Sequence, residues 1–66
     1  KGAYMKNSIT DKELSAYNEL LTQEKATVDK FNYYAQNCKD PNLKKLCKEA
    51  ANRHQEHFNI IFNQIQ

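Results

Sequence analysis

The chain has 66 residues, of which 39% are hydrophobic, with a single glycine, a single proline and no tryptophan. A chain of this length forms one domain at most, and a lone hydrophobic core of this size contributes only about 3–5 kcal/mol to stability. Ten basic and eight acidic residues are interspersed without a long run of one sign, which argues against nucleic acid as a partner.

Neither membrane insertion nor a disulfide framework is expected. No apolar stretch approaches the ~20 residues that a membrane span needs, and no short apolar run resembles a signal peptide. We therefore expect a cytoplasmic location and no membrane partner.

Cys38 and Cys47 have neither disulfide-scaffold nor zinc-finger spacing. We interpret both as small, partly buried apolar residues, with a cross-link between chains as the alternative.

The first predicted helix covers about residues 11–38. Residues 1–8 show no periodicity, and we expect them to form a flexible lead-in. Thr10 at the N-cap and Glu13 at the third helical position match a capping box, in which each side chain accepts a hydrogen bond from the other residue's backbone amide. No helix breaker follows until the segment before Pro41.

The second predicted helix covers about residues 41–65. Asp40 suits the N-cap, and Pro41 suits the first helical position because the amide hydrogen that it lacks would have no partner there. Pro41 also disfavours helical geometry at Asp40, which ends the first helix. Because the connection is so short, the helices must be antiparallel neighbours. Residues 9–66 are thus expected to form an all-α, antiparallel two-helix hairpin.

Each predicted helix carries a broad apolar face with steps that alternate between three and four residues, as in helices packed in a bundle. The seam of the first helix is Leu14, Tyr17, Leu21, Glu24, Val28, Phe31, Ala35 and Cys38, and Leu20 and Tyr34 widen its face. The seam of the second helix is Leu43, Cys47, Ala50, His54, His57 and Ile61, and Leu46, Phe58, Phe62 and Ile65 widen its face. A two-helix hairpin covers only part of two such faces. We therefore expect a homodimer in which two hairpins form a four-helix bundle.

Three polar residues interrupt these seams. Glu24 lies about fifteen residues before the turn, and His54 and His57 lie about fifteen to seventeen residues after it. At 1.5 Å per residue the three side chains fall within about one helical turn of the same level. We expect all three to point inward, where an unpaired carboxylate would cost several kcal/mol.

This set admits two interpretations. Glu24, His54 and His57 are of the types that bind iron, manganese or zinc, so they are the candidate metal ligands. Alternatively, they form a hydrogen-bonded polar layer that fixes the helix register without a metal. No catalytic residue is assigned, because neither cysteine lies level with the histidines and Ser15 lies toward the far end of the hairpin.

Several short segments resemble the spore coat F family, small ferritin-like proteins of spore-forming bacteria. They are LLTQEK at residues 20–25, DPNL at 40–43, and HQEH at 54–57 leading into IIF at 60–62. The resemblance covers about residues 13–65. It implies a ferritin-like bundle built from hairpins, a place in the spore coat, and other coat proteins as partners.

The resemblance also implies a position for a metal site. In ferritin-like sites a Glu on one helix joins a Glu-x-x-His pair on the next, and Glu24 and His57 match the first and last of these positions. His54 stands where the pair would have its Glu. This departure removes carboxylates that would bridge two irons, and it favours a simpler metal site or none.

Three functions follow as hypotheses. The first is a structural or coat-associated assembly protein. The second is a metal-binding protein with Glu24, His54 and His57 as ligands. The third is an adaptor whose open groove receives a helix from another protein. None of them requires the chain to be an enzyme.

Overall fold

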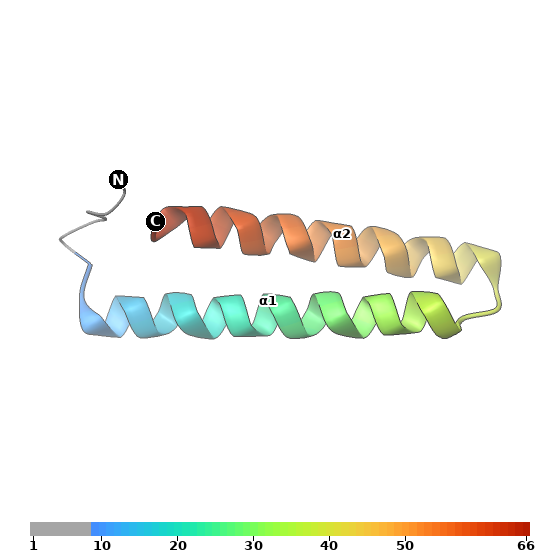
Figure 1. Cartoon of the computed structure of the whole chain (residues 1–66), viewed down its shortest axis with the longest axis horizontal. Coiled ribbons are helices and arrows are strands. Elements are labelled where there is room, and N and C mark those ends of the chain that lie inside the picture. Colours follow the sequence, from blue (N-terminus) through green and yellow to red (C-terminus); the bar gives the residue numbers. More distant parts are fainter. Residues whose placement is uncertain (1–8) are drawn as a thin grey trace.

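A computed structural model describes residues 9–66 as two α-helices joined by a short turn (Figure 1). Helix α1 covers Asp11–Asn37 and helix α2 covers Pro41–Gln64. They run antiparallel, side by side along their length, which confirms the predicted all-α hairpin (Figure 1). Each helix ends one residue before its predicted limit. The lead-in expected at residues 1–8 lies outside the described residues.

Both helices begin where their caps are predicted. The Thr10 side chain accepts a hydrogen bond from the Glu13 backbone amide at 3.0 Å, and Glu13 Oε1 accepts one from the Thr10 amide at 3.0 Å. This reciprocal pair is a complete capping box. At the start of α2, Asp40 Oδ1 accepts a hydrogen bond from the Asn42 amide at 3.0 Å, and Pro41 occupies the first helical position.

A contact across the turn stabilises the end of α1. The last turn of α1 contains no basic residue of its own, although a positive charge there would stabilise the helix dipole. Lys44 of α2 supplies that charge, because its ammonium group donates a hydrogen bond to the backbone carbonyl of Ala35. The two helix ends that flank the turn are thereby joined by a side chain as well as by the backbone.

The core between the helices is thin. Among the described residues, only Val28, Ala35, Cys47 and Ala51 are buried. The chain measures 48 × 20 × 11 Å along its principal axes. Its thickness of 11 Å is that of a single α-helix. The hairpin is thus one layer of two helices, which cover each other along only one side.

The buried seam of α2 differs from its prediction. Cys47, His54 and Ile61 lie toward α1 as expected, but the positions between them are Ala51 and Phe58 rather than Ala50 and His57. A step of four residues in place of three turns the apolar ring of Phe58 inward and leaves His57 at the edge. The sequence allows either step, and at the second of these positions the step of four places an apolar ring rather than an imidazole between the helices.

Leu14 and Leu43, at opposite ends of the predicted seams, are also exposed. Leu14 lies ten residues before Glu24, at a level where α2 has already ended at Gln64. Leu43 lies in the first turn of α2 and lines a hollow together with Phe31 and Tyr34 of α1. In each case the side chain has the predicted periodicity but is not fully covered by the other helix.

Neither α1 nor α2 is long and apolar enough to cross a membrane.

Candidate functional site

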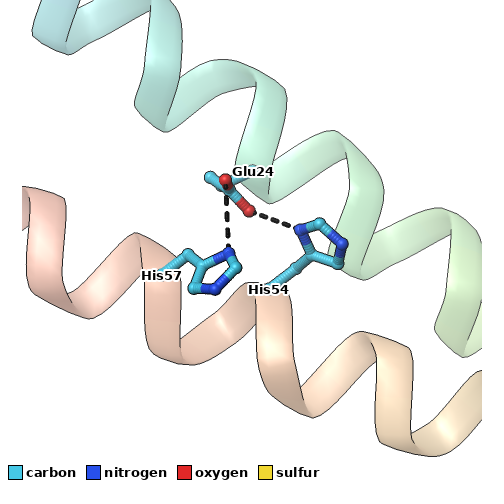
Figure 2. A group of neighbouring side chains, drawn as sticks. All are labelled: Glu24, His54 and His57. Atoms are coloured by element: carbon cyan, nitrogen blue, oxygen red, sulfur yellow. Dashed lines mark hydrogen bonds and ion pairs between the residues drawn. The ribbon is translucent and has the colours of Figure 1, made fainter.

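The three polar side chains singled out in the sequence lie together between the helices. Glu24 stands at the midpoint of α1, with thirteen helical residues on either side, and it faces His54 and His57 on α2 (Figure 2). The histidines are three residues apart, so both project from one side of their helix. One ligand atom from each residue can be chosen so that all three atoms lie within 4.8 Å of one another.

The Glu24 carboxylate contacts both imidazole rings (Figure 2). His54 Nδ1 lies 2.7 Å from Glu24 Oε1, and His57 Nδ1 lies 3.7 Å from Glu24 Oε2. An ionised carboxylate can only accept a hydrogen bond, so His54 donates from Nδ1. The first contact is a hydrogen bond and the second is a looser electrostatic approach. His54 is therefore the residue that holds Glu24 in place.

Ring contacts fix the two histidines. Phe31 of α1 stacks on His54 with an interplanar angle of 13° and a centroid distance of 6.4 Å. The His54 and His57 rings meet edge to face at 5.3 Å, within the range of favourable aromatic geometry. Phe31 was predicted only as a seam residue. Its ring contact with His54 is what makes it part of this site.

The cluster is less enclosed than the sequence predicts. The side chains of Glu24, His54 and His57 are 19%, 31% and 46% exposed, respectively. A single layer of two helices leaves one side of its seam open to water, and His57 lies on that side. The cost of desolvating the Glu24 carboxylate is correspondingly smaller than for a sealed core.

This arrangement fits both interpretations of the cluster. Two histidines and one carboxylate form the ligand set of sites that bind iron(II) and leave other coordination positions open, and three ligands plus a water molecule also suit zinc. As a polar layer, the cluster is already satisfied internally. Within residues 9–66, no buried side-chain nitrogen or oxygen lacks a partner.

A second feature is the open apolar face, which we define as Leu20 and Tyr34 of α1 with Leu43 and Leu46 of α2. All four side chains are exposed. Leu20 and Tyr34 are two heptads apart and so share one stripe of α1. Tyr34 and Leu43 line the same hollow between the helices, so both stripes belong to one side of the hairpin. His57, eleven residues after Leu46, lies on this side as well.

The hollow in the open apolar face lies next to the turn. Its volume is about 370 Å³, and it is lined by Phe31, Tyr34, Asn37, Cys38, Leu43 and Cys47. Both cysteines are free thiols within the chain, and Cys47 is buried whereas Cys38 is partly buried. The sequence marked most of these residues as apolar positions but did not show that they leave a hollow, because that depends on what lies opposite each side chain.

Comparison of the chain with protein-family models, with curated proteins and with solved structures found no match. The functional assignment therefore depends on the geometry of the polar cluster and of the open apolar face.

Proposed function

We propose that this chain is an assembly protein, one half of a ferritin-like four-helix bundle that a second copy completes by covering the open apolar face. The resemblance of residues 13–65 to the spore coat F family extends this proposal to a structural role in the spore coat. Other coat proteins are then further partners of the assembled bundle.

The observation that carries the proposal is the imbalance between buried and exposed apolar side chains. Four mostly small residues are buried, whereas Leu20, Tyr34, Leu43 and Leu46 are all exposed on one side. Burying one large apolar side chain stabilises a protein by about 1.5–3 kcal/mol. Each of these side chains is already about half covered, so covering all of them in two copies stabilises the dimer by roughly 6–12 kcal/mol before the cost of association is subtracted. This is more than the ~3–5 kcal/mol that so small a core provides.

Light scattering combined with sedimentation at micromolar concentration tests the assembly. The wild-type chain is expected to be a dimer, and Leu46→Glu is expected to shift it toward monomer because a carboxylate would be buried in the interface. Tyr33→Glu is the matched control: Tyr33 is 62% exposed and Leu46 is 61% exposed, but Tyr33 lies outside the open apolar face. A wild-type monomer at these concentrations would contradict the proposal.

Metal binding at Glu24, His54 and His57 is the second candidate function. It is favoured by the convergence of two imidazoles and one carboxylate within 4.8 Å. Iron, manganese and zinc all accept this ligand set. The exposed edge of His57 leaves room for water or a further ligand beside the metal, as sites with three protein ligands require.

Elemental analysis of protein purified without chelator, followed by titration with iron(II), manganese(II) and zinc(II), tests this second function. Glu24→Gln is expected to weaken binding strongly, whereas Glu19→Gln on the exposed surface of α1 is not. A metal content far below one ion per dimer, with no saturable uptake in the titration, would contradict metal binding.

Glu24→Leu separates the metal site from a polar layer. In a polar layer the substitution is expected to be close to neutral, because the two imidazoles that it leaves are 31% and 46% exposed and can bond to water instead. At a metal site it is expected to abolish uptake and to lose the stabilisation that bound metal gives to the folded state. Thermal unfolding with and without added metal measures both effects in one experiment.

A further inference from the structure

The hairpin is electrically polarised along its length. Glu24 and the histidines divide the described residues into a turn half, residues 25–53, and an open half, residues 9–24 and 54–66. The turn half has seven basic and three acidic residues, a net charge of +4 with histidine neutral. The open half has one basic and five acidic residues, a net charge of −4. Lys1 and Lys6 lie outside the described residues.

Two hairpins that share their open apolar faces can be related by a two-fold axis in two ways. An axis parallel to the helices places turn over turn, which brings the two positive halves together and the two negative halves together. An axis perpendicular to the helices, between the two layers, places each turn over the open end of the other copy. This second arrangement opposes +4 with −4 at both ends, and charge complementarity of this kind selects the orientation in which partners dock.

The position of Glu24 is compatible with the same arrangement. With thirteen residues of α1 on either side of it, a perpendicular axis at the level of Glu24 superimposes the full length of α1 on α1 of the second copy. Leu20 and Thr27 are one heptad apart on the same stripe of α1. With the axis at Glu24, Leu20 of one copy lies within about one residue, or 1.5 Å along the helix, of the level of Thr27 of the other copy. The hollow beside Tyr34 lies over the first turns of the second copy.

Given the proposed dimer, on which this inference rests, we propose that the second copy docks with its turn over the open end of the first. Its Glu24, His54 and His57 come to the same level as those of the first copy. The centre of the bundle then contains two carboxylates and four imidazoles from two chains. The two hollows lie at opposite ends of the assembly.

Distances between spin labels measure the orientation in the full-length chain. Cys38→Ser and Cys47→Ala remove the native thiols, and Lys39→Cys places one label at the turn of each copy. Lys39 lies fifteen residues from Glu24, so two turns at opposite ends are about 45 Å apart at 1.5 Å per residue. Two turns at the same end lie within about 20 Å, two helix diameters, of each other.

Gln23→Cys in the same background is the matched control. Gln23 is exposed on α1 at the level of Glu24, so its label reports a short distance in either orientation. A short distance at Gln23 with a long one at Lys39 is the expected result. Short distances at both positions would overturn the orientation while leaving the dimer intact. No dipolar signal at Gln23 would overturn the dimer and the orientation together.

Discussion

The two halves of the hairpin are packed differently, although they contain the same two helices. All four buried residues of the described chain, Val28, Ala35, Cys47 and Ala51, belong to the half next to the turn. In the open half, the residues between the helices are only half-buried, among them Tyr17, Leu21 and Phe58. Figure 1 shows the helices nearer each other at the turn and spreading toward the open end.

Side-chain size explains this difference. Ala35 and Ala51 allow the helix backbones to approach closely beside the turn, and the small Cys47 lies between them along the chain. Bulkier residues at the corresponding positions of the open half hold the helices apart, so that water reaches their sides. The polar cluster stands at the boundary, where the spacing is wide enough for a carboxylate and two imidazoles. Thus the hairpin is most stable at its turn and needs a second surface toward its open end.

The largest effect is expected from filling the close contact beside the turn. Ala51 is 2% exposed, and Ala51→Leu would insert three carbon atoms where there is no space, at a cost of about 1–3 kcal/mol in the free energy of unfolding. Ala26→Leu on the exposed surface of α1 is the matched control and should change little. Urea unfolding measures both, and equal stability of the two variants would contradict the close packing of the turn half.

Removing the contact across the turn should have the next largest effect. Lys44→Met keeps the aliphatic stem but removes the ammonium group that binds the Ala35 carbonyl. We expect a loss of about 1–2 kcal/mol, because both a charge-assisted hydrogen bond and a favourable interaction with the α1 dipole disappear. Lys45→Met, at an exposed neighbouring position, should be close to neutral. Thermal unfolding of the two variants compares them directly.

A smaller and more local effect is expected at the open end. Thr10→Ala removes the acceptor for the Glu13 amide and should lower the free energy of unfolding by about 1 kcal/mol, as at other helix caps. Hydrogen exchange would show faster exchange confined to the first turns of α1. Equal acceleration at the turn would mean that the two halves unfold as one unit rather than with separate stabilities.

The smallest effect concerns charge. Reversing Lys45 and Lys48 to Glu lowers the positive charge of the turn half from +4 to zero. If each turn lies over an open end, the dimer should weaken by less than about 1 kcal/mol per charge pair, and added salt should remove the difference. If turn lies over turn, the same variant should strengthen the dimer. Sedimentation at low and high salt gives the sign.

Much of the hairpin is decided by local sequence. The starts of the two helices are fixed by Thr10 with Glu13 and by Asp40 with Pro41. The side chains of Thr10, Glu13 and Asp40 accept hydrogen bonds from amides that have no partner within the helix. Pro41 has no amide hydrogen and so needs no partner at the first helical position. The short connection fixes their antiparallel direction. Regular helical rise then places Glu24, His54 and His57 at one level, which is why the candidate site could be predicted from residue numbers alone.

The rotation of each side chain about its helix could not be predicted in this way. After Cys47 and after His54, steps of three and of four residues both continue the seam, so Ala50 and Ala51, or His57 and Phe58, compete for the buried position. Only the packing of α2 against α1 decides between them, and it places Ala51 and Phe58 inside with His57 at the edge. Periodicity specifies the level and approximate face of a residue, whereas burial depends on the surface opposite it.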